Sequence, residues 1–352
     1  MLRNVTLSVL SIFLFSHCSQ EKPDIRVVCE TVPPGNYVLK WEIFPPMDGT
    51  VKIYESSVPD SFNLSSPIAE AEINKGFKDI FFVQTAKRSY FELVFNKKYS
   101  VITAERVIPT QSLSNLRDLG GYYTSTGRQT QWGKLFHSSS LARASFADAK
   151  VLNNLGIRTV IDFRTEQERF ESPSKYITSQ TFNFPLRGNA YNVFASSILS
   201  KKMKAGDVKV YAQDIFSFLL ENNSDYYIKM FDVLLEADNY PVLIYCSSGR
   251  DRSAVASALI LAALNVDSDQ IVNDYMQNNN QFDFSNLSKE NIYLKDPDIQ
   301  ETFTAMIRVH KGTIVYSFDK LIKEYGTLDN YFNTVLKLTA KKREKLKEIM
   351  LY

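Results

Sequence analysis

Cysteine, histidine and glycine are all scarce in this chain of 352 residues. The small numbers of cysteines and histidines argue against whole classes of protein. Three cysteines, Cys18, Cys29 and Cys246, are too few for a disulfide framework. Three histidines argue against a histidine-rich metal site, and we expect neither a metal nor another cofactor. The formal net charge is +2, without a basic arm or an acidic tail, so nothing suggests nucleic acid as a partner.

What remains is an ordinary globular composition, with 44% hydrophobic and 23% charged residues, which allows a sizeable core. At ~100–200 residues per domain, the length suggests about two domains. The residue pattern changes near residue 107. We therefore expect a targeting segment at 1–18, one module at 24–106 and a second domain at 107–352.

The N-terminus has the order of features found in an export signal. A positive charge at Arg3 is followed by an apolar run over 5–15, which is shorter than the ~20 residues that span a bilayer. The segment resembles a bacterial lipoprotein signal with Cys18 as the acylated residue, although Phe15 and His17 depart from the usual residues. We expect an exported protein, tethered by lipid to a bacterial membrane at the periplasm or cell surface. A plain signal peptide is the alternative.

Residues 24–106 show the alternation of polar and apolar residues that is typical of half-buried strands. Such stretches lie at 38–43, 51–54, 79–83, 90–95 and 99–102, with turn-forming residues between them. Short strands with this punctuation predict a small all-β sandwich, and the composition loosely resembles a fibronectin type III or immunoglobulin-like module. Cys29 is interpreted as a small buried hydrophobic residue.

From residue 107 onward, strands alternate with helices. Apolar strands are expected at 158–163 and 241–245, and helices at 147–155, 226–237, 254–264 and 341–351. This alternation predicts an α/β domain with a largely parallel sheet.

The second of these strands continues directly into Tyr245-Cys-Ser-Ser-Gly-Arg-Asp-Arg-Ser-Ala254, and a helix follows. In a loop between the end of a strand and the start of a helix, backbone N–H groups can converge on an anion. The loop-forming residues are Ser247, Ser248, Gly249 and Arg250. Arg252 can grip two phosphate oxygens with its planar guanidinium. The same positive field favours the thiolate form of Cys246, which is the nucleophilic form.

This arrangement predicts attack of the Cys246 sulfur on phosphorus and a covalent phosphocysteine. Ser253 could then donate a hydrogen bond to the sulfur as it leaves. Protonation of the leaving group needs a carboxyl group within reach of the ester oxygen. Asp251 is the first choice for this general acid, and Asp162 and Asp118 are alternatives. Asp162 is also read as a partner of Arg164 in a salt bridge, and Asp118 as a turn residue. Arg117 holds the substrate or braces the loop.

The second domain resembles the protein tyrosine phosphatases, and most closely a bacterial secreted branch whose loop ends in Lys-Asp-Arg-Thr-Gly. Matching segments are Asn115-Leu-Arg-Asp-Leu-Gly-Gly-Tyr122, Trp132-Gly-Lys-Leu-Phe136, Ile161-Asp-Phe-Arg164 with Glu166 and Glu168, and Ile271-Val-Asn-Asp-Tyr275. The resemblance covers about residues 108–338 and implies a three-layer phosphatase domain around a largely parallel sheet. Two departures stand out. Tyr245 replaces the histidine that usually helps to order the loop, and Arg250 replaces a lysine.

Three functions follow from these features. The first is a protein-tyrosine phosphatase, with dual specificity included. The second is a phosphoinositide or inositol phosphate phosphatase, favoured by the doubly basic loop around Asp251. The third is a binding module that keeps the anion pocket without turnover. The expected partners are phosphorylated proteins or phosphoinositides as substrates, and the membrane through the lipid anchor alone.

Overall fold

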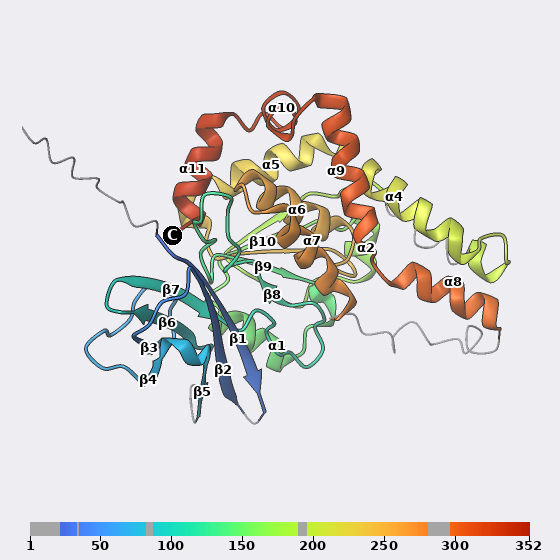
Figure 1. The fold of residues 1–352 in the computed structure, drawn as a ribbon. Helices are drawn as coiled ribbons and strands as arrows, with labels where there is room; N and C mark the ends of the chain where they lie inside the picture. The colour runs from blue at the N-terminus through green and yellow to red at the C-terminus, as the bar shows by residue number, and fades with distance from the viewer. Residues whose placement is uncertain (1–21, 34, 82–86, 189–195, 281–295) are drawn as a thin grey trace, which may run out of the picture.

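The computed structural model describes residues 22–33, 35–81, 87–188, 196–280 and 296–352 (Figure 1). The expected signal at 1–18, including Cys18, lies outside the described residues. Within the described part of the chain, two antiparallel sheets form from residues 24–104, and a five-stranded mixed sheet with helices follows (Figure 1). No helix in these described ranges has the length and apolar character needed to cross a membrane.

The N-terminal sheets pack their apolar sides against each other, because each strand alternates inward and outward residues. Their shared core includes Leu39, Trp41 and Phe95, and the rings of Trp41 and Phe95 meet edge to face at 6.1 Å. Cys29 is buried there as a free thiol, as expected. One sheet has the order β1-β2-β5 and the other β4-β3-β6-β7. Their strands are β1 (Asp24–Val32), β2 (Asn36–Phe44), β3 (Thr50–Ser56), β4 (Ala69–Glu72), β5 (Phe77–Ile80), β6 (Tyr90–Phe95) and β7 (Tyr99–Ala104).

These bounds confirm the strands predicted at 38–43, 51–54, 90–95 and 99–102. The strand predicted at 79–83 starts earlier, as β5, and residues 82 and 83 lie outside the described residues. The predicted likeness to a fibronectin or immunoglobulin module stays a prediction.

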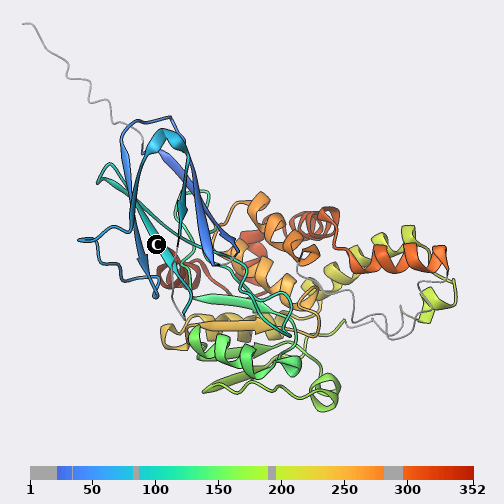
Figure 2. The same ribbon diagram turned by 90° about the horizontal axis from the view of Figure 1, so that it is seen from below.

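The second sheet has the order β11-β10-β12-β9-β8, with every neighbouring pair parallel except β8 and β9. This confirms the predicted mixed α/β class. Alternate residues of β12 face opposite layers: Leu243 and Tyr245 pack with α1, while Val242 and Ile244 pack with α5 and α6. Figure 2 shows helices on both sides of this sheet. Its strands are β8 (Arg117–Asp118), β9 (Leu135–Ser138), β10 (Thr159–Asp162), β11 (Gln180–Asn183) and β12 (Val242–Tyr245).

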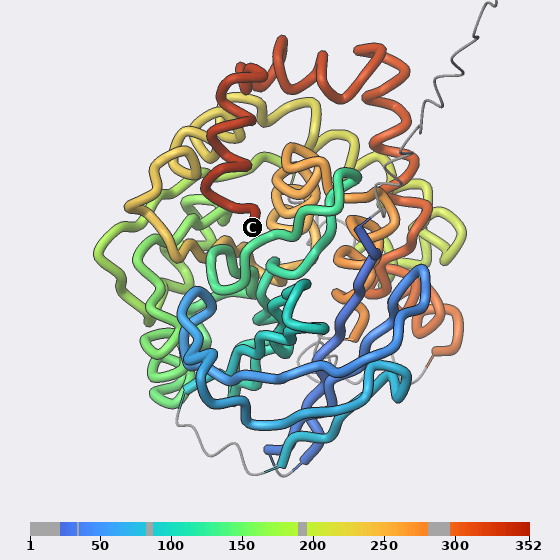
Figure 3. The backbone as a smooth tube through the Cα atoms, turned by 60° about the vertical axis from the view of Figure 1, so that its left-hand side comes forward, coloured from blue at the N-terminus to red at the C-terminus, as the bar shows by residue number. Residues whose placement is uncertain are grey.

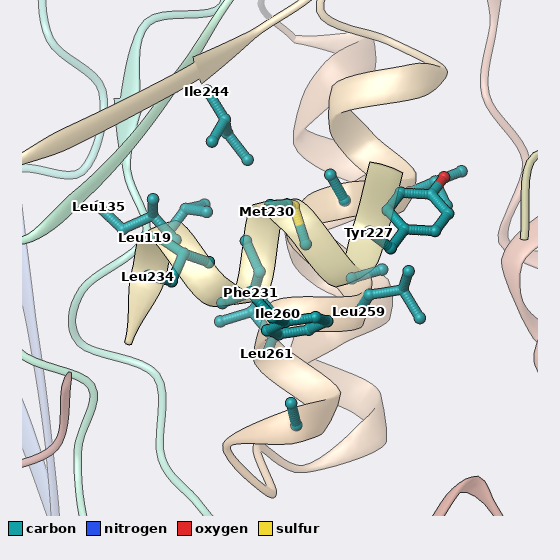
Figure 4. Packing of buried hydrophobic residues seen from close by; sticks show 14 of the residues in the cluster. Leu119, Leu135, Tyr227, Met230, Phe231, Leu234, Ile244, Leu259, Ile260 and Leu261 are labelled. Atoms are coloured by element: carbon teal, nitrogen blue, oxygen red, sulfur yellow. The ribbon is translucent and has the colours of Figure 1, made fainter. Parts of the chain in front are cut away.

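The largest core lies on the α6 side of the sheet, where α6 is buried along nearly its whole length. Figure 4 shows Tyr227, Met230 and Phe231 of α5 beside Leu259 and Ile260 of α6. The helices are α1 (Phe146–Asn154), α2 (Glu166–Glu171), α4 (Ala205–Glu221), α5 (Ser224–Leu234), α6 (Arg252–Ala263), α7 (Ser268–Met276), α8 (Pro297–Ile307), α9 (Lys311–Tyr325), α10 (Leu328–Thr334) and α11 (Ala340–Met350). The four predicted helices correspond to α1, α5, α6 and α11, whereas α2, α4 and α7–α10 were not predicted.

The two parts of the molecule are in direct contact. The indole of Trp132 donates to the carbonyl of Ile102 in β7 at 3.0 Å. The chain returns to this region at its end, where the Tyr352 amide donates to the carbonyl of Gln129 at 2.9 Å. Figure 3 shows the C-terminus beside the hairpin formed by residues 119–133. The segment before β9 is therefore held between the N-terminal sheets and the C-terminal helix.

Candidate active site

The strand β12 and the helix α6 place Cys246 and Arg252 at opposite ends of one loop. Cys246 directly follows β12, and only 1% of it is exposed. Arg252 is the first residue of α6, so its charge lies at the positive end of that helix. An arginine in this position is electrostatically unfavourable unless an anion accompanies it. The local sequence thus builds a loop that favours an anionic ligand.

The backbone of the loop is turned so that its N–H groups can receive an anion. Gly249 has φ +70°, a left-handed conformation that suits glycine. Within the described residues, the amides of Ser247, Ser248 and Gly249 have no hydrogen-bond acceptor in the protein. Behind the loop, Asn115 Nδ2 donates to the Gly249 carbonyl at 2.9 Å. Two loop carbonyls, those of Ser247 and Gly249, are thus bonded outside the loop, which suits an anion-binding nest.

Ser253 faces the nucleophile. Its Oγ lies 3.3 Å from Cys246 Sγ, within the range of a hydrogen bond to sulfur. Both residues are buried. The Ser253 hydroxyl is therefore placed to donate to the thiolate.

Glu168 of α2 holds Arg252 from across the loop. The two guanidinium nitrogens Nη1 and Nη2 lie 2.6 and 2.8 Å from the carboxylate oxygens. Ser247 Oγ bridges the pair, since it donates to Glu168 and accepts from Arg252 at 3.0 Å. Burial alone would raise the pKa of Glu168, but the hydrogen bonds and charge of Arg252 outweigh burial and lower that pKa to about 2. Glu168 is thus ionised at any working pH and fixes the orientation of the guanidinium.

Arg117 lies behind the loop. It forms a buried pair with Asp274 of α7, with Nε–Oδ1 and Nη2–Oδ2 distances of 2.9 and 3.1 Å. It also donates to Asn115, which in turn holds the Gly249 carbonyl. Of the two predicted roles, this position supports bracing of the loop, because Arg117 is fully buried.

Tyr245 and Asp162 form a separate network on the α1 side of the sheet. The Tyr245 hydroxyl donates to Asp162 Oδ2 at 2.6 Å, and Arg164 Nη2 donates to the same oxygen at 2.8 Å. Burial raises the pKa of Tyr245 and the Asp162 charge raises it further, so the hydroxyl keeps its proton. Asp162 therefore lies in the salt bridge with Arg164 that the sequence suggested.

Asp118 and Asp251 have contrasting surroundings. Asp118 is fully buried, accepts from the amides of Gly120 and Gly133 at 2.8 Å, and pairs with Arg88. Asp251 stands at the end of the loop with 40% of its side chain exposed. Among the three predicted carboxyl groups, Asp251 alone lies on the loop itself and retains access to solvent.

Arg250 of the loop makes contacts with other parts of the protein. Its Nη1 donates to the carbonyl of Ile307, at the end of α8, at 3.0 Å. Its side chain is 11% exposed and lies 3.4 Å from Asp251. The Arg250 guanidinium is therefore mostly engaged in contacts within the protein.

Several site residues were missed by sequence reasoning. Asn115 and Glu168 were noted as parts of matching segments without a role, and Asp274 lies in such a segment as well. His137 of β9, which contacts the Gly249 carbonyl at 2.6 Å, gave no signal in the sequence. No cluster of His, Cys, Asp or Glu side chains suited to a metal ion occurs in the described part of the chain.

A strand–loop–helix that carries a cysteine, an anion nest and a clamped arginine defines a cysteine-based phosphatase. Residues 108–352 match the tyrosine phosphatase family, and the chain belongs to that family. It is therefore a tyrosine-phosphatase-type enzyme.

Two relatives and one solved structure illustrate the similarity. A protein of Cupriavidus necator named as a tyrosine-protein phosphatase is 27% identical over 235 residues, which cover 64% of this chain and 83% of that protein. The triple specificity protein phosphatase PtpB of Mycobacterium tuberculosis is 27% identical over 188 residues, covering 47% of this chain and 66% of PtpB. The core catalytic domain of the PP-IP phosphatase SIW14 from S. cerevisiae is 15% identical with a TM-score of 0.28, covering 56% of this chain and 94% of that domain.

Proposed function

We propose that the protein hydrolyses phosphate monoesters of phosphotyrosine in proteins, with Cys246 as the nucleophile. The observation that carries this proposal is the loop between β12 and α6, where Cys246, Ser253 and the clamped Arg252 surround one anion nest. In the first step the thiolate attacks phosphorus, a sulfur–phosphorus bond forms and the ester bond breaks. In the second step water attacks the phosphocysteine, and phosphate leaves as the thiolate is restored.

Asp251 is the proposed general acid. It would give its proton to the leaving oxygen in the first step and take a proton from water in the second. Asp162 and Asp118 are less suited, because the side chain of each is nearly fully buried, whereas that of Asp251 is 40% exposed.

Phosphotyrosine is favoured over phosphoinositides because Arg250 is mostly engaged within the protein. The sequence suggests substrates with several phosphates because two arginines, Arg250 and Arg252, flank Asp251 in the loop. In the structure both loop cations are engaged within the protein, Arg250 with the Ile307 carbonyl and Arg252 with Glu168, so neither is left over for a second phosphate. Because the relative PtpB is named a triple specificity protein phosphatase, the substrate panel should extend beyond phosphotyrosine.

The nucleophile is tested by phosphate release from p-nitrophenyl phosphate with the full-length protein and its Cys246→Ser variant, with and without a chelator. We expect release by the parent, unaffected by chelator, and none by the variant. A parent that binds phosphate but releases none across pH 5–8 would favour the non-catalytic binding module instead.

The general acid is tested by comparing leaving groups. Asp251→Asn should lose about 10²–10⁴-fold in kcat/KM, which reports the first step, with phosphotyrosine, whose leaving group needs the proton, and much less with p-nitrophenyl phosphate. Asp162→Asn and Asp118→Asn are the matched controls. They should affect both substrates equally, through stability. If Asp251→Asn lost the same factor with both substrates, Asp251 would not be the general acid.

The lipid anchor at Cys18 and the envelope location are also proposals, which rest on the signal-like N-terminus. Metabolic labelling with a fatty acid should mark the parent and not a Cys18→Ala variant. Labelling of both, or of neither, would leave a plain signal peptide as the better reading.

A further inference from the structure

His137 lies at the back of the phosphate-binding loop, on the strand next to β12. It is fully buried. Its Nε2 is 2.6 Å from the Gly249 carbonyl and 3.4 Å from Ser253 Oγ. Its Nδ1 is 3.0 Å from Ser257 Oγ in α6. One imidazole ring thus contacts the loop, the hydroxyl that faces the nucleophile, and the helix behind both.

The protonation state of this ring follows from its partners. A carbonyl oxygen only accepts hydrogen bonds, so the nitrogen that faces Gly249 carries a proton. Burial lowers the pKa of His137, and the charge of Arg117 lowers it further, to about 3. The Asp274 charge and the Gly249 carbonyl act in the opposite direction without offsetting this. The ring is therefore a neutral donor at working pH.

Donation to Gly249 controls the direction of one loop amide. The carbonyl of Gly249 and the N–H of Arg250 belong to one planar trans peptide and point in opposite directions. Glycine allows this peptide to rotate more easily than other residues do. His137 and Asn115 both hold the carbonyl behind the loop, which turns the Arg250 amide to the other side. There it makes a long contact of 3.3 Å with Ser248 Oγ.

The same ring orders the proton of Ser253. Ser253 Oγ lies 3.4 Å from Nε2 and cannot donate to it, because that nitrogen carries a proton and no free lone pair. Its own proton is then free to point at Cys246 Sγ, 3.3 Å away. The hydroxyl is thus oriented as a donor to the sulfur.

We propose that His137 is the positioning residue that orders the phosphate-binding loop and the Ser253 hydroxyl. It does so from β9, while the position where the family usually has a loop-ordering histidine holds Tyr245, whose hydroxyl is bonded to Asp162 on the other side of the sheet. This inference rests on the proposed function, because a phosphate ester is the ligand that the ordered loop would serve.

The experiment compares His137→Leu, which removes the donor at similar volume, with His137→Gln, which keeps an amide donor. His310→Gln is the matched control outside the site. Each full-length variant is assayed for tungstate binding, which reads the loop without chemistry, and for kcat and KM with p-nitrophenyl phosphate. We expect His137→Leu to weaken tungstate binding and lower kcat roughly tenfold or more, the size of one lost hydrogen bond. His137→Gln should recover most of both, and His310→Gln should match the parent.

A folded His137→Leu variant with parental tungstate affinity and kcat would overturn the proposal, as would a His137→Gln variant impaired to the same degree. If His137→Leu does not fold, nitrogen NMR of the wild-type histidine rings decides. A His137 ring protonated at Nε2 from pH 5 to 8 supports the proposal, and a ring protonated at Nδ1 alone overturns it. A parent that binds tungstate in a His137-dependent manner without turnover would refute the proposed function while supporting the ordering of the loop.

Discussion

Arg88 and Asp118 form a buried ion pair that joins the N-terminal sheets to the catalytic domain, with an Nη1–Oδ2 distance of 2.5 Å. Arg88 lies just before β6, and Asp118 lies in β8. The guanidinium also stacks over the ring of Tyr90 and donates to the Glu105 carbonyl at 2.7 Å. Since Asp118 adjoins Arg117, which braces the loop, the N-terminal sheets support the segment on which the site is built.

Removal of one partner of this pair should strongly destabilise the protein. We expect Arg88→Met or Asp118→Asn to lower the free energy of unfolding by about 3–5 kcal/mol, because a buried charge is left without its partner. Urea denaturation measures the change. Lys52→Met is the control: it breaks the exposed Lys52–Glu70 pair, 3.8 Å apart, and should cost less than about 1 kcal/mol. Similar small losses in all three variants would contradict the structural role of Arg88.

Tyr245 should matter for stability rather than for turnover. Tyr245→Phe removes a buried hydrogen bond to the side chain of Asp162, which is expected to cost about 1–3 kcal/mol of unfolding free energy. The hydroxyl is bonded away from Cys246, so kcat should change little. Thermal denaturation and assays with p-nitrophenyl phosphate separate the two effects. A drop in kcat of about tenfold or more at near-native stability would mean that Tyr245 acts on the reaction.

Glu168 should make the stability of the protein depend on acid pH. Its pKa of about 2 in the folded protein lies below its ordinary value of 4.5. The stabilisation that ionised Glu168 gives the folded protein is therefore complete above about pH 4.5 and is lost as the pH falls toward 2. We expect Glu168→Gln to be less stable than the parent by about 1–3 kcal/mol at pH 7, with the gap closing from pH 4.5 downward.

Chemical denaturation between pH 3 and 7 tests this dependence. Glu171→Gln is the matched control, because Glu171 lies on the same helix and contacts Gln167 at the exposed surface. Its stability should follow the parent at every pH. A gap between parent and Glu168→Gln that stays constant over this range would show that the Arg252 pair does not set the Glu168 pKa.

Gly249 should tolerate no side chain. A Cβ there would lie 2.8 Å from the Ser138 carbonyl oxygen, at a φ of +70°. We expect Gly249→Ala to displace the loop and to reduce kcat by about 10²-fold or more, since aligned amide donors are lost. Gly127→Ala is the control, with φ +75° and no atom within 4 Å, and should cost only about 1 kcal/mol of stability. Parental kcat in Gly249→Ala would contradict the anion-nest geometry.

The sequence by itself determined those features that depend on neighbouring residues. The alternation along 90–95 fixed β6, and the apolar run before Cys246 fixed β12. The loop could be predicted because the nucleophile, the glycine turn and the arginine all lie within seven consecutive residues. Local spacing and backbone conformation suffice for such a motif.

The helices α4 and α8 could not be predicted from the same kind of pattern. They bury Val208, Ile299 and Met306 mainly against each other and their surroundings, rather than against the sheet. Whether such a segment becomes helical depends on a partner far along the chain, and amphipathic patterns are weak where that partner is unknown.

The tertiary structure alone decided which distant groups complete the site. Asn115 and Gly249 are 134 positions apart, and Arg117 and Asp274 are 157 positions apart. The structure also separated the three candidate carboxyl groups, because burial and ion pairing depend on what the fold brings alongside them. His137 shows this most clearly: an isolated histidine in a strand carries no signal, and its contact with the loop arises only because β9 lies beside β12 in the sheet.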